Sequence, residues 1–297
     1  MSIVDKLDKE IYELLEKTKK KDNKKNILVM SGGGIKGIGH IGALKALQDL
    51  NYLSNINIIA GTSIGALLGF MLVIGYKPDE LFNFIMIFDI QKIFSIVPAN
   101  IFKYYGLDNG DNIMLVISKL IIAKKLDPEI TFIELYKKTL IKLIITSSCI
   151  NDKKIYYFSH ETYPNMQVLK AIRMSISIPI YFAPVTYENQ IYIDGGCIDN
   201  YPIQLFNNDL DNVIGLYVSA NYSYTQNINN IEDFLTNMIQ CLFEGVVCNS
   251  LKGFEKQSIK ININNSKIGE FNSEFTNEDK KTMYDIGYKC VMSYFDK

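Results

Sequence analysis

The sequence predicts an α/β fold in which helices cover both faces of a mainly parallel central sheet. Short apolar runs that are typical of buried strands alternate along the chain with longer segments of helical character. Two glycine-containing turns join such a run directly to a helix: residues 31–37 follow the run 26–30, and residues 61–65 follow the run 56–60. The 297 residues are enough for one large α/β domain or two small ones.

The spacing of apolar residues predicts each element in turn. Strands are expected at residues 26–30, 56–60, 143–147, 155–158, 191–193 and 213–219, with an edge strand at 258–263. Helices are expected after the first turn through residue 50, from residue 66 onward, over most of 78–140, and at about 231–250 and 276–295. We therefore divide the chain into an N-terminal helix with a lysine-rich linker (1–25), a core (26–220) and C-terminal elements that complete the same domain (221–297).

Composition excludes several classes of protein. Apolar residues make up 48% and charged residues 21%, which is a globular balance, and the net charge of −1 offers no electrostatic basis for binding nucleic acid. Five cysteines without CxxC spacing indicate neither a disulfide framework nor a zinc site, and they fit a reducing compartment. Residues 66–76, the longest apolar stretch, are too few to span a bilayer, and the N-terminus lacks a signal-peptide pattern. We expect a cytoplasmic protein, either soluble or peripherally attached to a membrane.

The N-terminal residues 2–19 have the apolar spacing of an amphipathic helix, and a lysine cluster follows it at Lys17, Lys19, Lys20, Lys21, Lys24 and Lys25. Such a helix can lie on an anionic membrane, with each basic residue contributing roughly 1 kcal/mol near the surface. The alternative is a helix that packs on the side of the domain, followed by a solvated linker.

Ser63 lies on the second turn, in the sequence Gly61-Thr62-Ser63-Ile64-Gly65. A serine between glycines at two-residue spacing, on a strand-to-helix turn, is a nucleophile elbow. The turn is so sharp that side chains at both flanking positions would collide, and it exposes the serine hydroxyl to a substrate. The pentapeptide predicts a serine nucleophile without deciding which class of hydrolase uses it.

The first turn, residues 32–37, has the GxGxxG pattern of dinucleotide-binding loops. The acid that this function needs after the second strand is replaced by Gly61-Thr62-Ser63, and Lys36 precedes glycine rather than the Ser or Thr of a P-loop. Consecutive glycines at a helix N-terminus also allow backbone N–H groups to converge on a developing negative charge, as an oxyanion hole requires. One such donor can contribute roughly 3–4 kcal/mol.

The two histidines do not supply a catalytic base. Both His40 and His160 precede Asp194, so the order serine, acid, histidine of α/β-hydrolases cannot be built with that acid. His40 falls within the expected helix after the glycine loop, and His160 lies beside Glu161 in an expected turn. We interpret both as packed or solvated side chains.

Asp194 is the remaining candidate for the base. It ends an apolar strand and precedes Gly195 and Gly196, which places it at the mouth of the sheet with little steric cover. An ordinary Asp-Gly turn is the alternative on this evidence alone. To take a proton from Ser63, the carboxylate would need a dry site and a short hydrogen bond to the hydroxyl.

Together and in this order, the glycine loop, the elbow and the Asp-Gly-Gly turn resemble the patatin-like phospholipase family. Residues 171–179 (AIRMSISIP), 182–185 (FAPV) and 200–203 (NYPI) also resemble that family. Met174 and Ser177 stand where the family usually has a small residue and alanine, which would alter packing behind the site and not the two reactive residues. The resemblance covers about residues 26–220.

The resemblance implies a three-layer patatin-like fold and a lipid acyl hydrolase of the phospholipase A type, with neither metal nor cofactor. It implies Ser63 as nucleophile, Asp194 as base, an oxyanion hole at Gly32, Gly33, Gly34 and Gly37, and supporting roles for Lys36, Gly61, Gly65, Gly195 and Gly196. Lys36 either anchors the loop, meets a phosphate headgroup or is solvated. The expected partner is a membrane phospholipid or another lipid ester, with peripheral membrane contact through residues 1–25. The alternatives are a catalytically silent lipid-binding protein and, disfavoured by the missing acid, a dinucleotide-dependent oxidoreductase.

Aromatic residues are frequent in the segment 78–140: Phe82, Phe84, Phe88, Phe94, Phe102, Tyr104 and Tyr105. They either line an acyl channel or lid, or belong to the ordinary core.

Overall fold

A computed structural model describes residues 25–89, 92, 94–219, 227–263 and 276–296. The predicted N-terminal helix and most of the lysine cluster lie outside the described residues. Lys25, the last lysine of that cluster, donates a hydrogen bond of 2.7 Å to the Val213 carbonyl.

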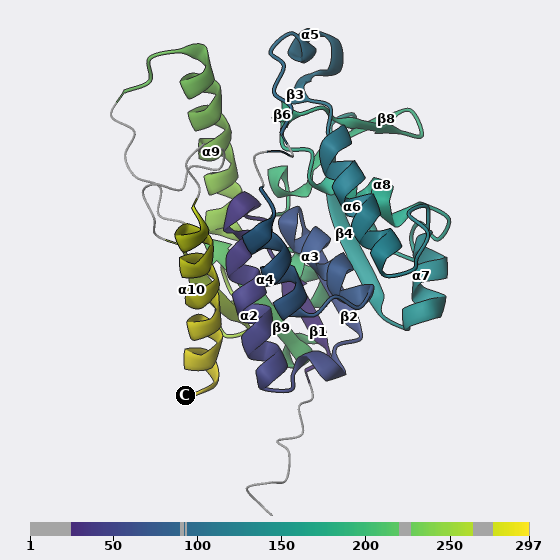
Figure 1. Cartoon of the computed structure of the whole chain (residues 1–297), viewed down its shortest axis with the longest axis vertical. Coiled ribbons are helices and arrows are strands. Elements are labelled where there is room, and N and C mark those ends of the chain that lie inside the picture. The colour runs from purple at the N-terminus through teal and green to yellow at the C-terminus, as the bar shows by residue number, and fades with distance from the viewer. Residues whose placement is uncertain (1–24, 90–91, 93, 220–226, 264–275, 297) are drawn as a thin grey trace, which may run out of the picture.

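The described residues form an eight-stranded sheet with the order β10-β9-β1-β2-β4-β8-β7, and β5 pairs with β4 off this path (Figure 1). The strands are β1 (Ile27–Met30), β2 (Ile58–Thr62), β4 (Lys142–Cys149), β5 (Lys154–Phe158), β7 (Val185–Tyr187), β8 (Gln190–Asp194), β9 (Val213–Ser219) and β10 (Ser258–Asn262). The neighbours from β10 to β4 pair in parallel, whereas β5 and β8 pair antiparallel with β4, and β7 does so with β8. The mainly parallel sheet and the edge strand β10 are confirmed.

The two faces of the sheet bury different side chains because successive residues of a strand alternate. Leu28 and Met30 of β1 join the large core beneath helices α2 (Ile38–Asp49), α3 (Ile64–Val73) and α10 (Asn277–Phe295). Ile27 and Val29 point to the opposite face and join a smaller core. That core is covered by the 3₁₀ segment η5 (Pro202–Phe206) and by residues that follow α9 (Ile231–Ser250). The chain therefore forms three layers.

Glycines bring the C-terminal helix α10 directly against α2 (Figure 1). A Cβ on Gly42 of α2 would lie 1.9 Å from the Tyr284 carbonyl oxygen, and one on Gly287 of α10 would lie 1.9 Å from the Gly39 oxygen. Only residues without side chains allow the two backbones to come this close. Met283 and Val291 of α10 thus join the same large core as α2, the helix that follows the glycine loop.

The other α-helices are α4 (Pro78–Ile87), α5 (Asn100–Tyr104), α6 (Asp111–Ala123), α7 (Phe132–Thr139) and α8 (Val168–Ser175). The expected break at 106–110 instead contains β3 (Gly106–Asp108), which pairs with β6 (Ile180–Phe182) in a second small sheet. Strands this short are stabilised by a partner distant in sequence, so their own periodicity does not reveal them. Of the described helices, none has the length and apolarity needed to cross a bilayer.

Candidate active site

Ser63 occupies a sharp turn between β2 and α3 with φ 53° and ψ −123°. A Cβ on Gly61 would lie 2.6 Å from backbone atoms of Gly65 and Ala66. A Cβ on Gly65 would lie 2.5 Å from the Met30 oxygen. Both glycines are therefore required by close backbone approach, and the turn has the strained geometry of a nucleophile elbow.

Strand β4 brings the ends of β2 and β8 together. Along β4, residues 142–146 pair with β2 and residues 147–149 pair with β8, while β5 pairs with 145–149. Because β5 overlaps both pairings, it occupies one edge of β4, and β2 and β8 share the other edge. Thr62, the last residue of β2, pairs with Thr146, and Asp194, the last residue of β8, pairs with Ser147. The two strands therefore run toward each other along this edge, and their last residues lie next to each other.

The Ser63 hydroxyl donates a hydrogen bond of 2.7 Å from Oγ to Asp194 Oδ2. The other carboxylate oxygen, Oδ1, accepts the Gly196 N–H at 2.7 Å. Ser63 is 6% exposed and Asp194 is 2% exposed, so this pair lies in a nearly dry environment. A hydroxyl bonded to a fixed, buried carboxylate has the arrangement of a nucleophile with its base.

The segment 171–179 fixes the backbone of both residues. The Ser63 N–H donates to Ser175 Oγ at 2.8 Å, and the Asp194 N–H donates to the Ser177 carbonyl at 2.8 Å. Both serines are fully buried. The nucleophile and the carboxylate are thus anchored to one short piece of chain.

Arg173 holds that segment against the small β3–β6 sheet. Its guanidinium donates to Ser177 Oγ at 2.6 Å, to the Asn109 carbonyl at 2.9 Å and to the Ala183 carbonyl at 2.8 Å. Burial lowers the pKa of Arg173 to about 10, partly offset by the charges of Asp108 and Asp111. The side chain is therefore still protonated at neutral pH and joins three chain segments behind the site.

The glycine loop lies next to Ser63 and contains four glycines with different surroundings. The Gly32 N–H donates to the Asn200 carbonyl at 3.0 Å, so that group is already bonded. Gly34 begins the 3₁₀ segment η1 (Gly34–Gly37) with φ 54°, a left-handed conformation that favours glycine. A Cβ on Gly37 would lie 2.3 Å from Ile64 Cγ1, so Gly37 serves close packing against the elbow. Lys36, between them, is 4% exposed.

His40 is a buried structural side chain of α2. Its Nε2 atom lies 2.9 Å from the carbonyl oxygen of Ser31, the residue before the glycine loop. Burial lowers the pKa of the imidazole to about 4, and the hydrogen bond to Ser31 opposes this shift. The ring is therefore neutral at pH 7 and braces the start of the loop.

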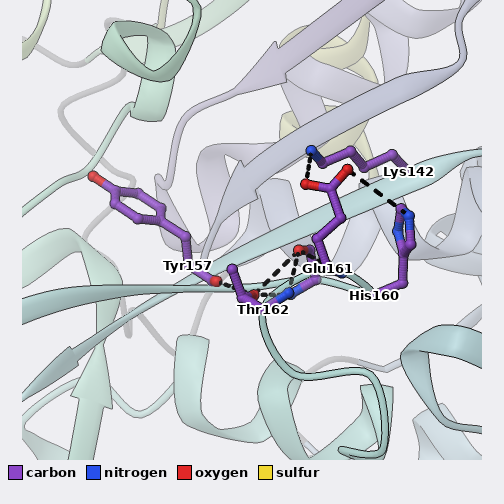
Figure 2. Close-up of polar contacts among 6 residues, drawn as sticks. Lys142, Tyr157, His160, Glu161 and Thr162 are labelled. Carbon is purple, nitrogen blue, oxygen red and sulfur yellow. Dashed lines mark hydrogen bonds and ion pairs between the residues drawn. The ribbon is translucent and has the colours of Figure 1, made fainter.

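His160 lies in a polar cluster at the surface, shown in Figure 2. Its ring stacks on Tyr136 with centroids 3.7 Å apart, and its Nε2 atom lies 4.0 Å from Glu161 Oε1. The Glu161 carboxylate also accepts a hydrogen bond of 2.5 Å from Lys142 Nζ. Partial burial lowers the pKa of His160. These contacts belong to packing at the start of β4, which agrees with the expected structural role.

A cavity of about 200 Å³ lies beside Ser63 between α2, α3, α4 and α6. Among the described residues that line it, Ser63 has the only polar side chain. The wall includes the aromatic residues Phe84, Phe88 and Phe94 of the segment singled out for its aromatics. Phe82, by contrast, packs on Tyr284 with ring centroids 4.0 Å apart, and Phe102 is 90% exposed. The segment 78–140 therefore contributes both to the cavity and to the core.

A model of the family described as patatin-like phospholipase matches residues 28–207. The chain belongs to the patatin-like phospholipase family. The match begins in β1, ends just after η5, and includes the glycine loop, the elbow and the Asp-Gly-Gly turn.

Relatives in this family include two viral proteins. An uncharacterized protein of Acanthamoeba polyphaga mimivirus is 32% identical over 281 residues, which are 89% of this chain and 91% of the relative. A probable lipid hydrolase of Invertebrate iridescent virus 6 is 34% identical over 186 residues, which are 60% of this chain and 62% of that protein. The crystal structure of VipD from Legionella pneumophila is similar with a TM-score of 0.60 at 18% identity, covering 92% of this chain and 67% of that one. This last likeness shows the three-layer fold of the family.

Three site-adjacent contacts were not predicted from the sequence as functional. Ser175 accepts the Ser63 N–H, Asn200 accepts the Gly32 N–H, and Thr146 contacts Thr62 with their hydroxyl oxygens 2.6 Å apart. Ser175 and Asn200 fall in segments that carry the family resemblance, which is the one signal that could have pointed to them. Thr146 lies in an ordinary buried strand, and nothing in the sequence distinguishes it.

Proposed function

We propose that this chain hydrolyses fatty acyl esters of lipids through an acyl-enzyme on Ser63. The observation that carries the proposal is the 2.7 Å hydrogen bond from Ser63 to Asp194 at the wall of an otherwise apolar cavity. Family membership and the iridescent virus relative, which is named as a probable lipid hydrolase, support a lipid ester as the substrate.

In the first half of the reaction, Ser63 Oγ attacks the ester carbonyl carbon while Asp194 Oδ2 accepts the hydroxyl proton. A tetrahedral oxyanion forms, its collapse breaks the bond to the alcohol, and Asp194 returns the proton to the departing oxygen. In the second half, water gives its proton to Asp194 and attacks the acyl carbon. Collapse of this second intermediate breaks the bond between the acyl carbon and Ser63 Oγ, Asp194 returns the proton to Oγ, and the fatty acid is released.

The oxyanion is stabilised by backbone N–H groups of the glycine loop. We assign this role to Gly33 and Gly34, because the Gly32 N–H is bonded to Asn200 and Gly37 packs against Ile64. The Ile64 N–H, at the N-terminus of α3, is the third candidate donor, since the first N–H groups of a helix have no partner within it. The burial of Lys36 favours a role in anchoring this loop over a solvated one.

The cavity is the proposed site of the acyl chain. A lining whose one polar side chain is the nucleophile suits a hydrocarbon tail and leaves the headgroup outside the cavity. The shape of this cavity would then select chain length, whereas the alcohol part of the ester would be recognised elsewhere.

Three proteins test the proposal: the unaltered chain, Ser63→Ala and Asp194→Asn. Each is treated with a fluorophosphonate probe and with a panel of phospholipids whose products are resolved by mass. We expect both variants to lose labelling and hydrolysis by about 10³-fold or more while keeping their unfolding midpoints. Ser54→Ala, at an exposed serine, is the matched control and should be fully active.

Full activity in Ser63→Ala would refute the nucleophile, and full activity in Asp194→Asn would refute the base. An unaltered chain that binds lipid and yet neither reacts with the probe nor hydrolyses any ester would be a catalytically silent lipid-binding protein.

A further inference from the structure

Two surfaces rich in exposed apolar side chains extend from the same end of the molecule. Figure 1 shows α9 and α5 both projecting beyond the sheet at the upper end of the long axis. We call the first surface the α9 stripe, formed by Ile231, Phe234, Met238 and Leu242. The second is the α5 tip, formed by Ile96, Val97, Phe102, Tyr104 and Tyr105.

The α9 stripe is a narrow apolar line along one side of a helix. Its residues are spaced by three, four and four positions, which at 100° per residue keeps them within about 80° of the helix circumference. Ile231 is 71% exposed and Leu242 is 67% exposed. A water-facing side of a helix normally has polar residues, so this stripe is arranged for contact with an apolar medium.

The α5 tip continues the wall of the cavity. Phe94 and Phe182 both line the cavity, with ring centroids 5.9 Å apart. Phe182 ends β6, which pairs with β3, and the Val97 N–H donates to the Leu107 carbonyl of β3 at 2.9 Å. The exposed residues of the α5 tip are therefore joined, through β3 and β6, to the side chains that enclose the cavity.

Helix α9 in turn leads away from the nucleophile and its base. A Cβ on Gly196, whose N–H holds Asp194, would lie 3.1 Å from the ring of Phe243 in α9. The stripe runs from the neighbouring Leu242 outward to Ile231. The two apolar surfaces thus begin on either side of the same site.

The charges on these surfaces indicate which kind of lipid contact they make. Residues 231–250 contain three acidic residues and neither lysine nor arginine, and residues 96–105 contain Lys103 as their one charged residue. Attraction to anionic lipid requires basic clusters. Contact through these surfaces would therefore depend on insertion of apolar side chains into the membrane interface.

We propose that the α9 stripe and the α5 tip dock this protein on a lipid bilayer by apolar insertion, with the Ser63 cavity between them facing the membrane. The choice of a bilayer as partner rests on the proposed lipid ester hydrolysis, because the substrate of such an enzyme is held in a lipid surface. This site is distinct from the N-terminal segment 1–25, whose lysines would favour anionic membranes.

Vesicle binding of the full chain tests the docking surface. Ser63→Ala is used as the parent so that no lipid is consumed, and its binding to phosphatidylcholine vesicles, with and without phosphatidylserine, is measured at low and high salt. We expect binding to vesicles of phosphatidylcholine alone, with little loss of affinity in high salt, because apolar insertion does not depend on charge. Phe234→Ser/Leu242→Ser and Phe102→Ser should each weaken binding by about tenfold or more.

Leu140→Ser is the matched control, because Leu140 is 70% exposed at the end of α7, away from both surfaces (Figure 1). It should bind as the parent does. All variants should keep the parent's unfolding midpoint, and the same substitutions placed in the unaltered chain should leave hydrolysis of a short water-soluble ester unchanged.

Three results would overturn the docking surface. One is unchanged vesicle binding by the stripe and tip variants. Another is binding only to phosphatidylserine vesicles that high salt abolishes. The third is a dimer that the stripe variant converts to a monomer, which would assign the stripe to self-association. Vesicle binding without any ester hydrolysis by the unaltered chain would instead refute the proposed function and leave the docking surface intact.

Discussion

The Oγ atom of Ser175 accepts a hydrogen bond of 2.8 Å from the backbone N–H of Ser63. This contact joins the last residue of α8 to the elbow, where the Ser63 backbone has a φ of 53° that is unfavourable for serine. Its N–H is buried, so the loss of its acceptor would cost about 1–3 kcal/mol. Ser175 is therefore a positioning residue that helps keep the proposed nucleophile in its strained conformation.

Ser175→Ala should lower kcat by about 10- to 100-fold with little change in KM, because the hydroxyl of Ser63 would be displaced while the cavity stays intact. The unfolding midpoint should fall as well. Steady-state kinetics on one lipid ester and the rate of fluorophosphonate labelling measure the effect. A variant with lower stability and an unchanged labelling rate would show that Ser175 is merely structural.

Two glycine substitutions should have opposite effects on stability. Gly65→Ala places a Cβ 2.5 Å from the Met30 oxygen, and we expect a loss of about 3 kcal/mol or more together with loss of activity. Gly245 lies inside α9 with open space around it, so Gly245→Ala should stabilise the protein by up to about 1 kcal/mol. Urea unfolding of both variants measures these differences. Equal midpoints would contradict the tight packing at the elbow.

His40 should make stability dependent on pH below neutrality. Its pKa is about 4 in the folded protein and near 6.5 when unfolded, so between these values the unfolded chain binds more protons. The contribution of His40 is present above pH 6.5 and is lost as the pH falls toward 4, by on the order of 3 kcal/mol. Unfolding free energies at pH 7.0, 5.5 and 4.5 should reveal this slope.

His40→Gln should remove most of that pH dependence and lower stability at neutral pH, because it alters the contact with Ser31. His160→Gln is the control at the other histidine. Because His160 is less buried, its replacement should change the pH dependence of stability much less. If His40→Gln keeps the pH dependence of the unaltered chain, another group is responsible for it.

Lys280 should stabilise the C-terminal end of helix α4, and this helix forms part of the cavity wall. Its Nζ atom donates to the Ile85 carbonyl at 2.9 Å and to the Phe88 carbonyl at 3.3 Å, where the last carbonyls of the helix need donors. Lys280→Met should destabilise the protein by about 1–2 kcal/mol and broaden the preference for acyl-chain length. The exposed neighbour Lys281 provides the control, since Lys281→Met should change neither property. If Lys280→Met keeps the acyl-chain-length preference of the unaltered chain, the hydrogen bonds of Lys280 do not influence the shape of the cavity.

Much of the fold could be predicted because the parallel strands are continuous apolar runs. Strands β1, β4, β9 and β10 and helices α9 and α10 lie within a few residues of their expected positions. Strand β2 begins and ends two residues later than expected, since Gly61 and Thr62 still pair with Ile145 and Thr146 before the chain turns. Helix α8 and strands β3, β6 and β7 were not predicted, because they are short and depend on distant partners.

At the candidate site, too, some features could be predicted from neighbouring residues and others depend on distant partners. Ser63 could be proposed from the turn on which it lies, and counting histidines removed the competing triad with the Asp194 turn. Asp194 became the expected base only through the family resemblance, because an Asp-Gly turn by itself is ordinary. The Gly32 N–H, by contrast, could not be known to bond Asn200, because that contact joins a turn to a segment far along the chain. Local conformation is encoded in neighbouring residues, whereas the availability of a backbone donor depends on everything that packs against it.

The sequence by itself determined the chemistry at hand: a serine on a turn that only glycines permit, an aspartate at the end of an apolar strand, and a loop of glycines before a helix. Only the tertiary structure decided that these groups meet. Strand β4 pairs with β2 and β8 along one edge, so two residues far apart in the chain lie within a hydrogen bond of 2.7 Å, and helices from four separate segments enclose the apolar cavity beside them. Such contacts arise from the register of strands and the packing of helices, which no local stretch of residues specifies alone.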